Sequence, residues 1–191
     1  MATLNIASWI QCSWTTLAAI WLMTLPFTKR TRWSETGASL ALQRCAFLFG
    51  LFLVGSDYFH QGWLARHVLP EMRSLQIIGL VLTMAGCGFA VWARLALGAN
   101  WSGTAKIKED HELIVKGPYR FARHPIYTGI LIACLGTTLA IGEWRCMVGL
   151  IVVSLGLVLK MTQEERLLTA AFPSAYPQYR RRVKALIPGL L

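Results

Sequence analysis

The sequence is poor in charged residues, and above all in acidic ones. Asp, Glu, Lys and Arg together make up 15% of its 191 residues, whereas soluble domains contain about 25%. Hydrophobic residues account for 55% of the chain. A soluble globule of this size could not bury so much apolar surface, and a disordered chain would not contain it. The composition therefore excludes both classes and indicates an integral membrane protein.

The sequence also lacks paired cysteines. None of its five cysteines has the C-x-x-C spacing of a zinc site or a redox motif. All of them lie within or at the start of apolar runs, where a cysteine packs as a small hydrophobic residue. We therefore assign them structural roles and expect no metal. They are Cys12, Cys45, Cys87, Cys134 and Cys146.

Acidic residues are too few to balance the basic ones, and the net charge is +10. Such a charge can indicate nucleic-acid binding. Anionic membrane lipids and the enrichment of Lys and Arg in cytoplasmic loops explain it equally well in an apolar chain. We therefore expect contacts with membrane lipids and no nucleic-acid partner.

Five apolar segments predict an all-α, polytopic bundle of five transmembrane helices. They cover about residues 4–27, 40–59, 75–97, 126–141 and 144–161, and the last continues as a charged helix to about residue 172. The first lacks the basic region and cleavage site of a signal peptide, so we expect a retained span. The fourth is shorter than the roughly 20 residues that a lipid core requires.

The chain is predicted to form one domain, residues 1–191. Residues 1–97 contain three transmembrane helices, and residues 98–191 contain a catalytic loop, a helical hairpin and a C-terminal amphipathic helix. Small residues recur at helical spacing in the fourth segment, and two glycines share a face of the fifth. Small residues let membrane helices approach closely, so we expect these two segments to form a tight antiparallel hairpin. The residues are Gly129, Ala133, Gly136 and Ala140, then Gly149 and Gly156.

Connections rich in basic residues alternate along the chain with connections that have few. Segments 29–32, 106–123 and 160–184 contain fourteen of them, whereas the intervening loops contain only Arg66, Arg73 and Arg145. With five spans, this alternation places the N-terminus outside and the C-terminus in the cytoplasm, in the inner membrane if the organism is prokaryotic.

Residues suited to chemistry gather on the predicted cytoplasmic side. In segment 116–129, a Gly-Pro turn and a His-Pro pair directly precede the fourth helix. A helix N-terminus can bind a carboxylate or phosphate, although an interfacial loop with an aromatic belt would show the same pattern. The C-terminal helix carries Tyr176 and Tyr179 on one face and basic residues on the others. It is expected to lie on the inner leaflet or to cover a site.

Four further side chains are candidates for a site. Glu164 and Glu165 are adjacent and project about 100° apart on a helix, so they cannot easily share one task. Lys160 lies one turn before Glu164, where a simple surface ion pair is the alternative explanation. Arg94, near the end of the third span, either extends to the interface or faces an anion inside the bundle.

Together these motifs resemble the isoprenylcysteine carboxyl methyltransferase family. Residues 117–129 resemble its signature G-x-Y-x-x-x-R-H-P-x-Y-x-G, and the stretch from Glu164 to Pro188 resembles its E-E…F-G…Y-x-x-Y…V…P ending. The resemblance covers about residues 94–188. Phosphatidylethanolamine N-methyltransferases share the two-part pattern, including the paired glutamates.

The resemblance implies S-adenosylmethionine as the cofactor, bound on the cytoplasmic side between the last two spans and the tail. The implied cofactor-binding residues are Lys106, His111, Glu112, Leu113, Ile114, Tyr119, His124, Pro125, Ile126, Tyr127 and Glu164. Lys160 stands where eukaryotic members have an Arg that contacts the substrate, and Pro173 stands where Gly is usual. Lysine keeps the charge of that arginine but loses its two-pronged hydrogen bonding.

A carboxylate acceptor is already ionised at neutral pH, so methyl transfer to it needs alignment and exclusion of water rather than a base. We expect Lys160 and Arg94 to act as the catalytic residues by orienting a lipophilic or prenylated acceptor that arrives sideways from the bilayer. An amine acceptor, as in a phospholipid N-methyltransferase, would need a base. Two further alternatives are a sterol-reductase-type enzyme that uses NADPH, against which the paired glutamates weigh, and a non-enzymatic lipid-binding scaffold.

Overall fold

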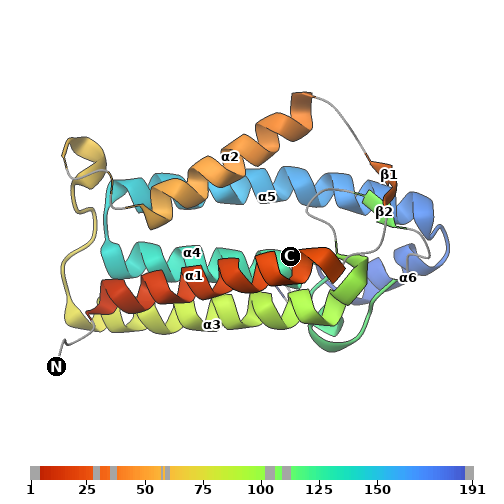
Figure 1. Ribbon diagram of the computed structural model, residues 1–191, viewed down its shortest axis with the longest axis horizontal. Helices are drawn as coiled ribbons and strands as arrows, with labels where there is room; N and C mark the ends of the chain where they lie inside the picture. The colour runs from red at the N-terminus through yellow and green to blue at the C-terminus, as the bar shows by residue number, and fades with distance from the viewer. Residues whose placement is uncertain are drawn as a thin grey trace.

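Five long helices dominate the structure, which is a computed structural model (Figure 1). It describes residues 5–27, 31–34, 38–56, 58, 61–101, 106–108 and 113–187. The long helices are α1 (Ile6–Thr24), α2 (Ala38–Gly55), α3 (Arg73–Leu97), α4 (Pro125–Ile141) and α5 (Trp144–Ala171). Each coincides with one predicted apolar segment. The shorter helices are η1 (Leu25–Phe27), η2 (Trp63–Ala65), η3 (Gly98–Asn100), η4 (Gly117–Arg120) and α6 (Ala175–Arg182).

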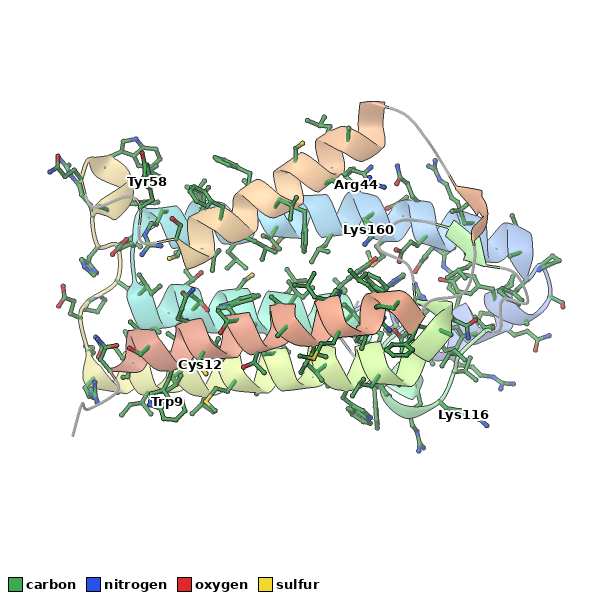
Figure 2. The ribbon with its side chains drawn as sticks, in the orientation of Figure 1. Trp9, Cys12, Arg44, Tyr58, Lys116 and Lys160 are labelled. Carbon is green, nitrogen blue, oxygen red and sulfur yellow. The ribbon has the colours of Figure 1, made fainter. Side chains whose placement is uncertain are left out.

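The helical fold and the membrane character of the chain are confirmed. Three helices of the described part are long and apolar enough to cross a membrane: Ile6–Phe27, Arg73–Asn100 and Trp144–Ala171. The apolar helices Ala41–Gly55 and Pro125–Ile141 are shorter. Large apolar side chains project outward along the bundle (Figure 2), as expected of surfaces that face lipid.

A short antiparallel ribbon adds to the predicted all-α fold. Strand β1 (Thr31–Ser34) pairs with β2 (Lys106–Lys108), with Thr31 opposite Lys108 and Ser34 opposite Lys106. The ribbon joins the connections that follow α1 and α3 at one end of the bundle (Figure 1). Strands this short depend on a partner distant in the sequence, so no local pattern indicates them.

The helices pair differently from the prediction. A Cβ atom added to Gly129 would lie 2.7 Å from the nitrogen of Ala90, so the small-residue face of α4 packs against α3. A Cβ atom added to Gly149 would lie 2.7 Å from the carbonyl oxygen of Gly50, so the glycine of α5 faces α2. The expected tight packing of α4 against α5 through these residues is therefore wrong. Both stripes recur at helical spacing, but their spacing does not specify which neighbour each stripe meets.

The two ends of the bundle differ in character. The start of α4, the end of α5, helix α6 and the β ribbon lie together at one end (Figure 1). At the other end, Arg145 is buried, its Nε donates to Glu143, and its Nη1 donates to the carbonyl oxygens of Leu53 and Ser56. Arg145 therefore closes the C-terminus of α2 instead of adding charge to an exposed loop. Because the charge of Arg145 is paired with that of Glu143, it adds little positive charge to this end of the bundle.

Candidate active site at the start of helix α4

The turn before α4 positions the aromatic and basic residues of the site. Gly117 has φ of 60°, a left-handed conformation that favours glycine, and Pro118 follows it inside η4. Tyr119 belongs to the same short helix, and its side chain is buried. His124 then adopts a non-helical conformation, with φ of −122° and ψ of 59°, as the N-cap of α4, because the proline at position 125 disfavours a helical residue before it. The local sequence thus places His124 at the first turn of α4.

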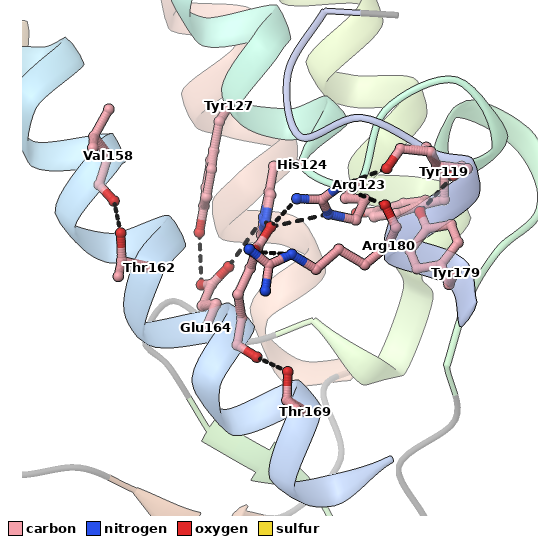
Figure 3. Close-up of polar contacts among 12 residues, drawn as sticks. Tyr119, Arg123, His124, Tyr127, Val158, Thr162, Glu164, Thr169, Tyr179 and Arg180 are labelled. Carbon is pink, nitrogen blue, oxygen red and sulfur yellow. Dashed lines mark hydrogen bonds and ion pairs between the residues drawn. The ribbon is translucent and has the colours of Figure 1, made fainter. Parts of the chain in front are cut away.

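Glu164 of α5 meets two side chains from the first turn of α4 (Figure 3). The hydroxyl of Tyr127 donates a hydrogen bond of 2.6 Å to Oε1 of Glu164, and Nδ1 of His124 lies 3.6 Å from Oε2. The rings of His124 and Tyr127 stack in parallel with centroids 5.3 Å apart. The Glu164 side chain is 21% exposed, so it is held in place and only partly exposed to solvent.

Lys160 completes this group. Its Nζ lies 3.9 Å from Oε1 of Glu164 and 5.2 Å from the centroid of the Tyr127 ring. An ammonium over an aromatic face is a favourable arrangement. The structure therefore brings together four of the predicted site residues: Lys160, Glu164, His124 and Tyr127.

Glu165 has a separate set of partners. Its Oε1 accepts from Nη2 of Arg123 at 2.6 Å and from Nε of Arg123 at 3.0 Å, and its Oε2 lies 3.5 Å from Nε of Arg180. Nε2 of His124 lies 3.3 Å from Oε1 of Glu165. The expectation that the adjacent glutamates serve different tasks agrees with this geometry, and His124 lies between them.

The charges around His124 determine its protonation. Burial lowers the pKa of His124, whereas hydrogen bonds to Glu164 and Glu165 and the charges of both raise it, and the net pKa is above the ordinary 6.5. Burial also raises the pKa of the Tyr119 hydroxyl, with the charge of Glu164 adding to the effect and that of Arg94 opposing it. The two carboxylates therefore favour the protonated form of His124, and the charges of Arg94 and Glu164 both act on Tyr119.

Arg94 occupies a different environment from the one predicted. It is 2% exposed, and its Nη1 and Nη2 donate to the carbonyl oxygens of Gly98 at 3.0 Å and Thr24 at 2.9 Å. Its guanidinium lies 4.4 Å from the ring centroid of Trp101. Arg94 thus links the C-terminal ends of α1 and α3, where a cation is stabilised by the helix dipoles. Its Nε is buried without a hydrogen-bond partner in the described part of the chain.

The remaining predicted residues fall into three groups. Pro125 and Ile126 are buried in the first turn of α4, and Leu113 and Ile114 are half-buried in the segment that leads to η4. Lys106 lies in β2, and its side chain is outside the described part. His111 and Glu112 also lie outside the described residues.

Four backbone N–H groups around the start of α4 already have partners. Those of Tyr127 and Thr128 donate to the carbonyl oxygen of His124, at 3.0 and 3.1 Å. Those of Arg123 and His124 donate to the carbonyl oxygens of Lys184 and Ala185, in the C-terminal segment 183–187. The helix start therefore offers less to an anion than the sequence suggested, because the chain itself uses these donors.

The sequence interpretation missed Arg123 and Arg180 as members of this cluster. It assigned Arg123 to a basic loop and Arg180 to a basic helix face on the membrane. The signal that could have found Arg123 was its place directly before His124, inside the recognised motif. Its second alternative for α6, a cover over the site, agrees with the structure, since the hydroxyl of Tyr179 donates to the carbonyl oxygen of Tyr119 at 2.5 Å.

Comparisons with known proteins agree with the motif resemblance. The sequence model of the isoprenylcysteine carboxyl methyltransferase (ICMT) family matches residues 77–170. The protein-S-isoprenylcysteine O-methyltransferase of Schizosaccharomyces pombe is 36% identical over 88 residues, which are 44% of this chain and 36% of that protein. The cobalt-zinc-cadmium resistance protein CzcN of Cupriavidus metallidurans is 28% identical over 142 residues, which are 73% of this chain and 60% of that protein.

A solved structure shows a similar fold. The eukaryotic intramembrane Ras methyltransferase ICMT matches 81% of this chain and 55% of its own, with a TM-score of 0.54 and 23% identity. The chain spans 36% and 60% of the length of the two curated relatives named above. The resemblance to the isoprenylcysteine carboxyl methyltransferase family is confirmed, and the matched residues include His124, Tyr127, Lys160 and Glu164.

Proposed function

We propose that this chain, whose residues 77–170 match the isoprenylcysteine carboxyl methyltransferase family, is an integral membrane methyltransferase that uses S-adenosylmethionine. Its acceptor is the carboxylate of an isoprenylcysteine-type or other lipophilic molecule. The observation that carries this proposal is the partly exposed side chain of Glu164, whose carboxylate is held by Tyr127 and His124 with Lys160 beside it. The name of the Schizosaccharomyces pombe relative, a protein-S-isoprenylcysteine O-methyltransferase, supports the acceptor class.

The residues around Glu164 fit the groups of S-adenosylmethionine. When bound, the cofactor supplies an electrophilic methyl group on a sulfonium. The Glu164 carboxylate has about four acceptor positions, and its contacts to Tyr127, His124 and Lys160 leave room for an ammonium or ribose hydroxyl donor. Because those neighbours fix the carboxylate before a ligand arrives, binding requires little reorganisation.

Lys160 is the residue that suits an acceptor carboxylate. Its side chain is 27% exposed and its ion pair with Glu164 is loose, at 3.9 Å. It therefore loses little by turning toward a second carboxylate, which it would hold beside the methyl donor. Arg94, by contrast, bonds backbone carbonyls with two of its guanidinium nitrogens, so we now assign it to holding the ends of α1 and α3 and not to the acceptor.

The protonation of His124 favours a carboxylate acceptor over an amine. An amine must lose a proton before or during methyl transfer, which requires a base. His124 lies between two carboxylates that raise its pKa above 6.5, which favours its protonated form and makes it a poorer base. A carboxylate acceptor is ionised and needs no such base. This weighs against the phospholipid N-methyltransferase alternative.

We also propose that all five long helices span the membrane, with the site at the cytoplasmic face. The shorter helices α2 and α4 pack closely against α5 and α3, which are long enough to cross. The end that carries the site also carries the basic segments, which the distribution of charge places in the cytoplasm.

Calorimetric titration of S-adenosylhomocysteine into the detergent-purified full chain tests the cofactor assignment. We expect wild type to bind and Glu164→Ala to lose binding. Arg166→Ala, which removes an exposed charge from the same helix, should bind as wild type does. A well-folded wild type that does not bind would contradict the proposal, and NADPH would then be titrated to test the reductase alternative.

A further inference from the structure

Two neighbouring carboxylates on α5 meet two different parts of the chain. Glu164 meets Tyr127 and Lys160, beside the proposed cofactor. Glu165 meets Arg123, from the loop before α4, and Arg180, from α6. Glu165 is therefore the point at which three separate segments converge, as Figure 3 shows for the residues around it.

Arg123 extends this cluster to the C-terminal segment 183–187. While its Nε and Nη2 bond Glu165, its Nη1 donates to the carbonyl oxygens of Val183 at 2.5 Å and Arg180 at 3.3 Å. A guanidinium with five N–H donors in a fixed plane is suited to such simultaneous bonding. The orientation of Arg123 therefore links Glu165 to the end of α6.

The C-terminal segment lies across the start of α4. The N–H groups of Arg123 and His124 donate to the carbonyl oxygens of Lys184 and Ala185, both at 2.9 Å. The hydroxyl of Thr128 donates to the carbonyl oxygen of Leu186 at 2.8 Å. The segment thus covers the residue, His124, that also contacts Glu164.

We propose that Glu165 is a positioning residue, which holds segment 183–187 across the start of α4 through Arg123 and so closes the cofactor site. This inference rests on the proposed function only for the identity of the bound ligand. The contacts of Glu165 and Arg123 do not depend on it. Glu165 acts through Arg123 and His124, whereas Glu164 contacts the ligand. In this proposal Glu164 binds the ligand, and Glu165 keeps the site closed.

Burial determines which partner of Glu165 matters most. The side chains of Arg123 and Glu165 are only 8% and 12% exposed, whereas Arg180 is 60% exposed. Removing one partner of a buried ion pair leaves the other charge buried without compensation, whereas an exposed pair contributes little. Arg123 is therefore the main partner, and Arg180 is secondary.

Hydrogen–deuterium exchange on the detergent-purified full chain tests the proposal without a ligand. In Glu165→Gln we expect the amides of residues 183–187, and those of Arg123 and His124, to exchange at least about tenfold faster, since local opening becomes easier. The exchange rates of amides within α3 and α4 should not change. Glu165→Asp keeps the charge, and the long Arg123 side chain can follow it, so we expect it to restore most of the protection.

Glu164→Gln is the matched variant on the neighbouring position. It should lose affinity for S-adenosylhomocysteine while its C-terminal segment exchanges as in wild type. Glu165→Gln should bind S-adenosylhomocysteine about tenfold more weakly, and Arg180→Gln should lie between it and wild type in both measurements. If Glu165→Gln does not fold, Arg123→Lys decides the matter, because it keeps the buried charge but loses the planar set of donors that bonds Glu165 and Val183 together.

Two results would overturn the proposal. Unchanged exchange of the C-terminal segment in both Glu165→Gln and Arg180→Gln would show that the cluster does not hold it. Faster exchange throughout the bundle in Glu165→Gln, not corrected by Glu165→Asp, would show a general role in stability. Failure of wild type to bind S-adenosylhomocysteine would instead contradict the proposed function, while the exchange data would still test whether Glu165 holds the segment.

Discussion

Tyr127 and Glu164 are 37 residues apart in the sequence, yet the hydroxyl of one donates a 2.6 Å hydrogen bond to the carboxylate of the other. The bond joins the first turn of α4 to the charged end of α5. It also orients the one carboxylate in this region that we assign to the cofactor.

Tyr127→Phe removes the hydroxyl but keeps the ring that Lys160 and His124 contact. A hydrogen bond to a charged group is worth about 1.5–3 kcal/mol, so we expect at least about tenfold weaker binding of S-adenosylhomocysteine, measured by calorimetry. Tyr58→Phe is a suitable control, because Tyr58 is exposed and lies at the opposite end of the bundle from Lys116 (Figure 2). Equal weakening in both variants would contradict a specific role for Tyr127.

Lys160→Met keeps the length of the side chain and removes its charge. We expect the KM for a prenylated cysteine acceptor to rise about tenfold, with little change in affinity for S-adenosylhomocysteine. Lys160→Arg should retain low KM, since a guanidinium pairs with carboxylates at least as well. Steady-state kinetics with varied acceptor separates these effects. Loss of S-adenosylhomocysteine binding in Lys160→Met would reassign Lys160 to the cofactor.

The pKa of His124 makes stability depend on pH. Because its folded-state pKa is raised above 6.5, the histidine contributes stability that is fully present below 6.5 and is lost as the pH rises through the folded-state pKa. We expect Tm in detergent to fall as the pH is raised from 6 to 9. The slope should be smaller in His124→Gln, which cannot gain the charge. Identical slopes in the two proteins would mean that His124 does not keep its proton.

Substitutions at two glycines in α3 distinguish the effect of helix packing on stability from the effect of helix propensity. A Cβ atom added to Gly86 would meet the backbone of α4, whereas one added to Gly88 would meet nothing within 4 Å. Gly86→Ala should therefore destabilise the protein by about 1–3 kcal/mol through overpacking. Gly88→Ala should be neutral or slightly stabilising, because alanine favours the helix. Thermal unfolding in detergent measures both, and similar Tm values would contradict the close pairing of α3 with α4.

Sequence patterns were sufficient for the helices and for part of the site. Apolar segments end where charged or turn residues begin, so the bounds of α1 to α5 follow from local composition. His124, Tyr127 and Glu164 were found because they lie within motifs whose spacing is characteristic. Lys160 followed because a residue one helical turn from Glu164 must share its face.

The remaining features depend on contacts between distant segments. A glycine stripe such as that of α4 shows that a helix packs closely, but not whether its neighbour is α3 or α5. Arg94 bonds carbonyls of two helix ends, and carbonyl oxygens carry no signal in a sequence. The same holds for the C-terminal segment, which binds α4 mainly through its backbone, so the sequence could not decide between a membrane surface and a cover over the site.

The most direct measurement is transfer of a labelled methyl group from S-adenosylmethionine to a prenylated cysteine by the purified full chain in lipid vesicles. We expect a labelled product in wild type, released as volatile methanol by mild base because it is an ester, and no product with Glu164→Gln. A base-stable label on phosphatidylethanolamine would contradict the acceptor assignment. No transfer by a well-folded wild type that also fails to bind S-adenosylhomocysteine would contradict the account as a whole.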